Sequence, residues 1–217
     1  RSGGAEAPAY TSIVASGANA CVLHYVFNNK PLRDGDLLLI DAAAEFGSYA
    51  ADITRTFPVN GRFSAAQKDA YELVLAAQAA AIDAVRPGNH WNSPHEAAVR
   101  VLTQGMVDLG LLHGEVDGLV ESGAYSRFYM HRTGHWLGMD VHDAGEYKLQ
   151  GEWRPLVPGM TLTVEPGLYI RPGDDVPEAF WNIGIRIEDD VAVTASGCEV
   201  LTTPPKTVAE IEDWMKA

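Results

Sequence analysis

Two aspartates lie inside one apolar stretch of the sequence, and they constrain how that stretch can fold. Asp41 ends the run "LLLID" and Asp52 begins the run "DITRTF", so both carboxylates have small or hydrophobic neighbours. The turn-forming letters "EFGS" between the two runs predict a β-hairpin. If the chain turns at Phe46 and Gly47, Asp41 lies directly opposite Asp52, a position in which like charges destabilise a sheet.

Three interpretations of this aspartate pair remain open on these residues alone. The aspartates are surface residues without a role, they share one proton as an acid dyad, or they hold a cation between them. A buried carboxylate without a partner costs on the order of several kcal/mol, so the apolar flanks argue against the first interpretation. The cation interpretation predicts further oxygen or nitrogen ligands elsewhere in the chain.

Two glutamates late in the chain meet this requirement. In "GIRIEDD", strand alternation puts Arg186 and Glu188 on one face and two isoleucines on the other. In "TLTVEPG", Glu165 ends an alternating run directly before a Pro-Gly break, a position that suits a rigidly held ligand. Each glutamate alone also fits a solvated strand edge, but two predicted hairpins with two carboxylates each argue against four unrelated surface positions.

Histidines are concentrated in one loop-like segment. His131, His135 and His142 fall within twelve residues of the aromatic and glycine-rich run "RFYMHRTGHWLGMDVHDAG". The spacing of four between the first two is found in zinc-binding helices, but the glutamate of that motif is absent and Gly134 disfavours a helix. We expect His24, in the alternating run "CVLHYVF", to be a core histidine unless its face of the sheet carries the site. The remaining three histidines are expected at the surface: His90, His95 and His113.

The element order predicts an α+β fold. Residues 10–59 contain the β-rich runs "YTSIVASG", "CVLHYVF" and "DLLLID", separated by turn-formers. Residues 64–85 are alanine-rich with helical spacing, begin with a capping box of Ser64 and Gln67, and end at "RPG". A second helix is expected from Ser93, as the cap, to about residue 112, with Glu96 closing the box.

Strand character returns after this helix pair. The runs "MTLTVEPGLYI" and "NIGIRIEDDVAVT" predict a second hairpin, and Thr207 with Glu210 predicts a capped terminal helix. Two hairpins with two special carboxylates each suggest pseudo-two-fold helix-helix-strand-strand repeats. Only "RSGGAEAPA" precedes the first strand, so the helices of the first repeat are expected upstream of Arg1, outside this chain.

Charge and cysteine usage exclude several classes of protein. The net charge of −13 argues against sequence-independent binding to nucleic acid or to an anionic membrane, both of which need basic surface. The sequence has no apolar run of the roughly 18 residues that suggest a spanning helix. Cys21 and Cys198 match no metal or redox spacing, and we expect two free thiols in a cytoplasmic protein.

Four motifs together resemble one enzyme family. "DITRTFPVNG", "HWLGMDVHD", "TVEPGLYI" and "GIRIEDDV" occur in the order found in the aminopeptidase P group of Xaa-Pro peptidases, and the bacterial branch is most similar. The resemblance runs from Pro8 to the C-terminus. It implies the pita-bread fold, with its repeats around a curved antiparallel sheet, and it implies that the whole of 1–217 is a catalytic domain. Members also carry an N-terminal domain, which we expect as a partner, and often form homo-oligomers.

The resemblance also implies a set of site residues. Two divalent ions would be held, with manganese favoured and cobalt, zinc or magnesium open. Thr54 would support the ligands. The family's five ligands correspond to Asp41, Asp52, His135, Glu165 and Glu188. The residues that correspond to substrate-holding or catalytic groups are His24, His131, His142, Tyr169 and Arg186.

The implied reaction is removal of the first residue of a peptide when proline follows it. A hydroxide between the two ions would attack the peptide carbonyl, Glu165 would move its proton to the proline nitrogen, and His142 and His131 would donate to the oxyanion. The "HWLG" segment and Tyr169 are expected to form an apolar wall for the proline ring. Two alternatives stay open, a prolidase restricted to Xaa-Pro dipeptides and a pita-bread binding module without catalysis, while a methionine aminopeptidase fits the motifs less well.

Overall fold

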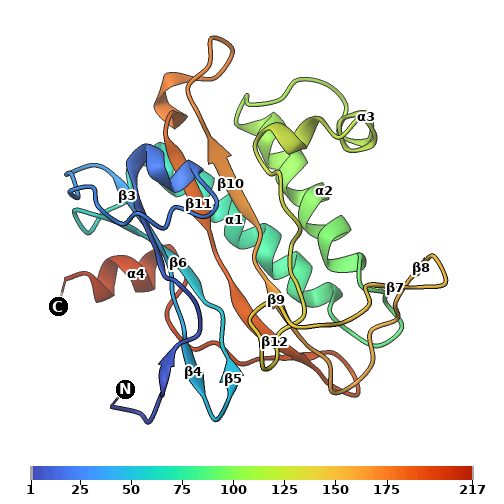
Figure 1. The fold of residues 1–217 in the computed structure, drawn as a ribbon. Helices are drawn as coiled ribbons and strands as arrows, with labels where there is room; N and C mark the ends of the chain where they lie inside the picture. Colours follow the sequence, from blue (N-terminus) through green and yellow to red (C-terminus); the bar gives the residue numbers. More distant parts are fainter. Residues whose placement is uncertain (1, 217) are drawn as a thin grey trace.

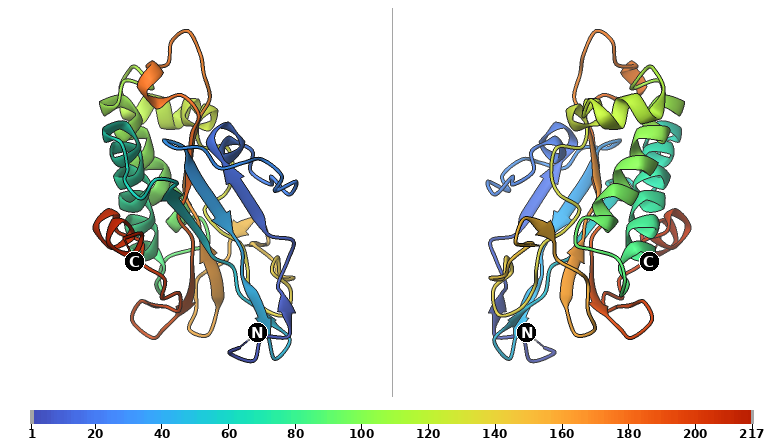
Figure 2. Two further views of the ribbon diagram at one scale, coloured as in Figure 1. Left: turned by 90° about the vertical axis from the view of Figure 1, so that its left-hand side faces the viewer. Right: turned by 90° about the vertical axis from the view of Figure 1, so that its right-hand side faces the viewer.

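A layer of helices covers one face of a strongly curved layer of antiparallel strands. The computed structural model describes residues 2–216. Helices α1 (Ala65–Ala84) and α2 (Ser93–Asp108) pack against each other, and viewed edge-on they form one layer with the strands on the other side (Figures 1 and 2). The short helices α3 (Val116–Glu121) and α4 (Val208–Trp214) flank this pair. The predicted α+β class and element order are confirmed.

The first hairpin is built from residues before α1. Strands β2 (Ile13–Ser16), β3 (Leu37–Asp41) and β6 (Thr54–Pro58) form one antiparallel sheet in the order β2-β3-β6. The tip of the hairpin continues as a smaller sheet of β1 (Ala7–Pro8), β4 (Ala44–Phe46) and β5 (Tyr49–Ala50). These strands lie on the open side of the molecule, away from α1 (Figure 2).

The second hairpin is interrupted in its middle. Strand β9 (Thr161–Val164) pairs with β12 (Asp189–Val193), and β10 (Gly167–Ile170) pairs with β11 (Ile183–Arg186). The two ladders share one register. Each predicted strand is therefore interrupted once, and the two interruptions lie opposite each other, at residues 165–166 and 187–188. The remaining elements of this half are β7 (Lys148–Leu149), β8 (Glu152–Trp153), β13 (Cys198–Val200) and the 3₁₀ helices η2 (Ala124–Arg127) and η3 (Glu178–Phe180).

The main core lies between α1 and the second hairpin. Helix α1 buries Ala70, Val74, Ala77 and Ala81 completely, and its small side chains let the helix lie close to the sheet. The facing strands contribute buried isoleucine, leucine and valine side chains on the same side. The first hairpin has a separate, smaller cluster around Leu39. The second hairpin therefore packs on the main core over its length, whereas the first hairpin contacts the main core mainly at one end, through Leu37.

The helix ends follow the sequence signals with one exception. The capping boxes of Ser64 with Gln67 and of Thr207 with Glu210 are both present. The predicted cap at Ser93 is wrong, because its hydroxyl accepts a hydrogen bond from the His90 backbone N–H and the cap position falls on Asn92. Helix α2 also ends at Asp108 rather than near residue 112.

The predicted strand at "CVLHYVF" is wrong. Gly17 has a φ of +55°, which ends β2 and starts the 3₁₀ helix η1 (Gly17–Cys21), and the chain then runs as a loop. The Cys21 thiol donates to backbone carbonyls of β10 and β11, and Val26 and Phe27 are exposed instead of alternating into a core. This segment is a loop over the second hairpin, and both Cys21 and Cys198 are free thiols.

The turn of the first hairpin lies one residue later than predicted, which shifts the strand pairing by two residues. Phe46 pairs with Tyr49, so Gly47 and Ser48 form the turn, both with positive φ, as the type I′ turn favoured in hairpins requires. Asp41 consequently lies opposite Thr54 and not opposite Asp52. A shift of two residues preserves the face, so the two aspartates remain diagonal neighbours on the same side of the hairpin.

Within residues 2–216, no helix is both long enough and apolar enough to cross a lipid bilayer.

Candidate metal centre

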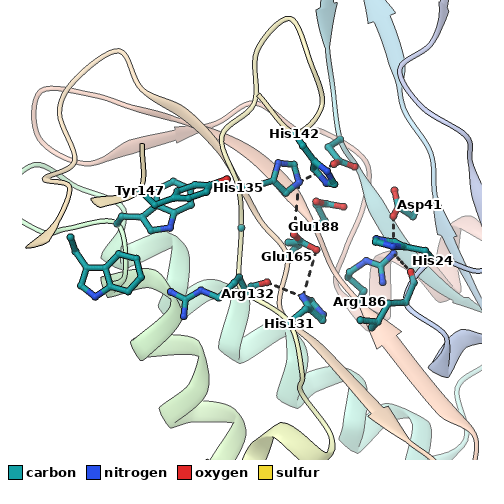
Figure 3. Close-up of a pocket in the computed structure, with 15 residues that line it drawn as sticks. His24, Asp41, His131, Arg132, His135, His142, Tyr147, Glu165, Arg186 and Glu188 are labelled. Carbon is teal, nitrogen blue, oxygen red and sulfur yellow. Dashed lines mark hydrogen bonds and ion pairs between the residues drawn. The ribbon is translucent and has the colours of Figure 1, made fainter. Parts of the chain in front are cut away.

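A cavity of about 630 Å³ lies between the two hairpins and collects most of the residues that the sequence singled out (Figure 3). Carboxylates from both hairpins and histidines from the connecting loops line it. Its polar end is lined by His24, Asp41, Asp52, His131, His135, His142, Glu165, Arg186 and Glu188. Leu23 lies beside His24 and Arg186, and the other end is lined by Trp91, Arg132, Gly134, Tyr147 and Trp153.

Three of these side chains form a compact group with the donor set of a divalent metal site. One ligand atom each of Asp52, His135 and Glu188 lies within 4.8 Å of the other two. The Nε2 atom of His135 is 3.2 Å from Asp52 Oδ2 and 3.8 Å from Glu165 Oε1. Oxygen-rich donors with one imidazole and no thiolate suit hard or borderline divalent ions.

The backbone prepares His135 for this position. Its Nδ1 atom lies 3.0 Å from the carbonyl oxygen of Trp136, so Nδ1 carries the proton and donates to that oxygen. Its backbone N–H donates to Thr163 Oγ1 of β9, which fixes the loop to the sheet. The Nε2 lone pair is thereby directed at the carboxylates, as in histidines that ligate metals.

The two glutamates lie directly across the second hairpin from each other. Val164 pairs with Asp189 and Gly167 pairs with Arg186, so the same register places Glu165 opposite Glu188. Burial raises the pKa of Glu165 to about 7, against the opposing charge of Arg186, and burial followed by the charge of Asp52 raises the pKa of Glu188. Both pKa values are raised because the carboxyl groups are buried close to other carboxylates, and Arg186 offsets only part of this effect.

Asp41 is held by groups from outside its own hairpin. Its Oδ1 accepts a 2.6 Å hydrogen bond from the Tyr10 hydroxyl, and its Oδ2 accepts a 2.7 Å bond from Arg186. Burial still raises the pKa of Asp41, because the neighbouring Asp52 opposes the effect of Arg186. The expected proximity of Asp41 to the other carboxylates is met, although its oxygens lie outside the compact group of three.

Thr54 connects the two hairpins at the centre of the site. Its hydroxyl donates to Glu188 Oε2 at 2.7 Å and accepts from the Arg186 Nε at 3.2 Å. The Glu188 backbone N–H donates to the Thr54 carbonyl. Thr54, which was expected beside the candidate ligands, therefore contacts Glu188 directly.

Tyr169 lies beneath the cavity and does not line it. Its hydroxyl is 2.8 Å from His131 Nε2 and accepts a 3.1 Å hydrogen bond from Arg186. The Nδ1 of His131 lies 2.8 Å from the Arg132 carbonyl and 3.8 Å from Glu165. Burial, followed by the charge of Arg186, lowers the pKa of His131 to about 3, so this imidazole is neutral and fixed on both nitrogens.

His142 and His24 reach the cavity from loops and are more exposed. The His142 ring meets the His135 ring edge-to-face at 4.4 Å between centroids. Burial and the nearby His135 lower the pKa of His142. His24 is a loop residue at the cavity rim rather than a core residue, as Figure 3 shows. The alternative that His95 is a plain surface residue is wrong, because it is largely buried and bonded to Thr133.

The electrostatics of the cavity fit a bound cation. Asp52 Oδ1 is buried without a hydrogen-bond partner in the described part of the chain, although buried carboxylate oxygens are normally paired. Four carboxylates face the cavity, and Arg186 is the arginine that contacts one of them there. Divalent cations would satisfy the unpaired oxygen and the uncompensated charge together.

Several residues of the site were not recognised from the sequence. Tyr10 and Asp190 bond to the aspartates, Asp190 by accepting the Asp52 backbone N–H at 3.1 Å. The apolar wall is formed by Trp91, Tyr147 and Trp153 rather than by the "HWLG" segment. The only hint in the sequence was that these aromatic residues occur near the motifs. No spacing rule predicts that residues 91, 147 and 153 line the same cavity.

Comparisons with known proteins agree with this geometry. The description of metallopeptidase family M24 matches residues 1–195. A Xaa-Pro aminopeptidase of Haemophilus influenzae is 55% identical over 212 residues, which cover 97% of this chain and 49% of that protein.

Two solved structures have the same fold. Pseudomonas aeruginosa aminopeptidase PepP superposes with a TM-score of 0.98 at 63% identity, covering 100% of this chain and 49% of that one. Escherichia coli aminopeptidase P with the inhibitor Pro-Leu gives a TM-score of 0.95 at 50% identity, covering 99% of this chain and 49% of that one. The chain therefore spans about half the length of these relatives and has the mixed α+β fold of their pita-bread part.

Proposed function

Because the chain belongs to metallopeptidase family M24, we propose that it forms the catalytic domain of a metal-dependent Xaa-Pro aminopeptidase. Such an enzyme hydrolyses the bond between the first residue of a peptide and a following proline. The observation that carries the proposal is the compact group of Asp52, His135 and Glu188 in the wall of a cavity of about 630 Å³.

Two divalent ions, with manganese favoured, would occupy the polar end of the cavity. Asp52 and Glu188 would contact both ions, Asp41 would complete one ligand set, and His135 with Glu165 would complete the other. When bound, such ions provide a water of lowered pKa and polarise the scissile carbonyl. Four carboxylates would balance the charge of two divalent ions, which removes the electrostatic cost of burying the carboxylates close together.

Glu165 is the proposed general base and acid. Its carboxylate lies beside His135 at the cavity surface, where it would accept a proton from the attacking water and pass it to the proline nitrogen. Its place at the end of β9, next to the Pro166 break, keeps the side chain fixed during this transfer.

Three histidines are assigned to the substrate. His142, which is exposed beside His135, would donate to the developing oxyanion. His24 would contact the peptide at the rim. We assign His131 to the same region, where its contacts to Tyr169 and Arg132 would keep it neutral and oriented.

The aromatic end of the cavity gives the proposal its substrate class. Trp91, Tyr147 and Trp153 offer flat apolar surfaces, and a proline ring needs such a wall and no hydrogen bond from its nitrogen. The free amino group of the peptide would lie at the acidic end. This polarity explains cleavage of a single residue from the N-terminus.

Peptide cleavage with defined substrates tests the proposal. We expect the Mn²⁺-loaded protein to release alanine from Ala-Pro-Ala-Ala and to leave Ala-Ala-Ala-Ala intact. Cleavage of Ala-Pro alone would identify a prolidase. Absence of any cleavage by protein that binds Mn²⁺ would favour a binding module and overturn the proposal.

A further inference from the structure

A glutamine buried behind the site contacts the backbone at both glutamates. Gln78 lies in the middle of α1 and is completely buried. Its Nε2 donates to the carbonyl oxygens of Val164 at 3.4 Å and Ile187 at 3.3 Å. Val164 directly precedes Glu165 and Ile187 directly precedes Glu188, so one side-chain amide joins the two chain segments that present these carboxylates.

The need for this amide follows from Pro166. The register of the second hairpin puts Pro166 opposite Ile187, and the Ile187 N–H donates to the Pro166 carbonyl at 3.3 Å. In an antiparallel pair the return bond would run from residue 166 to the Ile187 carbonyl, but proline has no N–H. Gln78 supplies a donor to this carbonyl from the helix.

The remaining atoms of Gln78 are also fixed. Its Oε1 accepts a 3.0 Å hydrogen bond from Lys206 Nζ, and Lys206 forms an ion pair with Asp189 at 2.5 Å. Asp189 is paired in turn with Arg55 at 2.7 Å, and Arg55 donates to the Glu188 carbonyl at 2.6 Å. We call Gln78, Lys206, Asp189 and Arg55 the rear network.

The rear network and the cavity lie on opposite sides of the same interrupted ladder. Glu165 and Glu188 form a non-hydrogen-bonded pair and exchange no backbone bonds, and the neighbouring pair of Pro166 and Ile187 keeps only one of its two bonds. Outward backbone bonds hold them instead, from Glu165 to the Thr133 carbonyl and from Glu188 to the Thr54 carbonyl. Both of these bonds point away from the partner strand, whereas Gln78 bonds to one carbonyl on each strand.

We propose that Gln78 is a positioning residue that sets the distance between Glu165 and Glu188 and thereby the affinity of the site for divalent ions. It replaces the ladder hydrogen bond that Pro166 removes, and the rear network fixes its orientation. The inference rests on the proposed function, because it requires the two glutamates to hold metal.

The test compares Gln78→Met with Gln67→Met. Methionine has a similar volume and no amide, and Gln67 is a matched control, since it lies in the same helix, is also buried and donates to the Gly35 carbonyl. We expect Gln78→Met to weaken Mn²⁺ binding in calorimetry by about tenfold, as is typical when groups that orient ligands are removed. Gln67→Met should lower the melting temperature and leave the dissociation constant unchanged.

A spectroscopic measurement separates positioning from loss of stability. The Co²⁺-loaded Gln78→Met protein should show shifted visible absorption bands, because these bands follow ligand geometry, while Co²⁺-loaded Gln67→Met should match the unmodified protein. If Gln78→Met does not fold, Lys206→Met carries the same test, since it removes the donor that orients the Gln78 amide.

Each outcome decides a specific claim. Equal Mn²⁺ affinity and equal Co²⁺ spectra in the folded Gln78 or Lys206 variant and the unmodified protein would overturn the positioning role and leave the proposed function intact. Failure of the unmodified protein to bind Mn²⁺ at all would overturn the proposed function and this inference with it.

Discussion

The two hairpins present the same kind of side chain with different means of support. In the second hairpin, the glutamates are directly opposed and are backed by α1 and its buried core. In the first hairpin, Asp41 and Asp52 are offset by two residues, and the face that carries Asp41 also carries Leu39, which belongs to a separate, smaller cluster. The glutamate pair is therefore positioned by packing of its hairpin on the hydrophobic core, and the aspartate pair by hydrogen bonds from other elements.

The first hairpin depends on the second for its order. Asp41 is bound by Arg186, Asp52 donates its N–H to Asp190, and Arg55 forms its ion pair with Asp189. All three partners belong to the second hairpin. We call these contacts between the hairpins the junction. We expect substitutions in the junction to lower the free energy of unfolding, and substitutions of single carboxylates to change metal affinity and turnover.

The largest effect is expected from breaking the junction. Arg55→Met leaves the buried Asp189 with Lys206 as its remaining partner and removes bonds to the Pro204 and Pro205 carbonyls. We expect a loss of about 3–5 kcal/mol in the free energy of unfolding, measured by urea denaturation. Arg100→Met, which breaks the exposed pair with Asp117, is the control and should change it by at most about 0.5 kcal/mol. Equal losses in both variants would refute the dependence of the first hairpin on the second.

The next effect concerns the carboxylate that is assigned to proton transfer. Glu165→Gln keeps the size and position of the side chain but removes its ability to accept a proton. We expect turnover of Ala-Pro-Ala-Ala to fall at least about a hundredfold, or about 2.7 kcal/mol in the barrier, while Mn²⁺ still binds. Unchanged turnover at saturating metal would rule out this assignment.

A smaller effect, on metal affinity, is expected from removing the hydrogen bond that Tyr10 donates to Asp41 of the first hairpin. Tyr10→Phe removes the hydroxyl that donates to Asp41 Oδ1 and lies near Asp52, and it keeps the aromatic ring. We expect the weaker of the two Mn²⁺ dissociation constants to rise by about fivefold to tenfold in calorimetry. Tyr25→Phe, which removes a hydroxyl bonded to Asn29, should leave both constants unchanged. A Tyr10 variant with unaltered binding would mean that Arg186 alone orients Asp41.

The smallest effect is a pH dependence of stability in metal-free protein. Burial raises the pKa values of Glu165 and Asp190 to about 7, so the folded state binds more protons than the unfolded state up to that pH. Their stabilisation is present at low pH and is lost as pH rises through about 7. The lowered pKa values of His95 and His131 act in the opposite direction, but only below about pH 6.5, the ordinary histidine value.

The melting temperature of metal-free protein should therefore fall from about pH 6.5 to about pH 8. Mn²⁺ should cancel this fall, because it binds the ionised carboxylates and competes with protons. Differential scanning calorimetry with and without chelator measures both curves. A melting temperature that rises over this interval without metal would contradict the clustering of the carboxylates.

The sequence was sufficient wherever local chemistry decides the structure. Helix caps at Ser64 and Thr207 follow from side-chain hydrogen bonds within four residues, and the alternation around Glu188 follows from strand geometry. The register of the first hairpin was missed because turns at residues 46–47 and at residues 47–48 both contain Gly47. The choice depends on which residue adopts a positive φ, and Ser48 does so here.

Contacts between distant segments were not accessible from the sequence. Tyr10, Asp190 and Gln78 reach the site through tertiary packing, and no local pattern marks them. The run "CVLHYVF" alternates like a strand, but Gly17 at the end of β2 redirects the chain over the second hairpin. The motifs therefore pointed to the candidate ligands, and the groups that contact these candidates became visible only in the structure.

The most direct test is an anomalous difference map from crystals soaked in Mn²⁺. We expect two peaks about 3.5–4 Å apart between the hairpins. Asp52 and Glu188 should contact both ions, with Asp41 on one ion and His135 with Glu165 on the other. A map without a peak in the cavity, or with a single ion that touches only one hairpin, would contradict the claim that the two hairpins together form one metal centre.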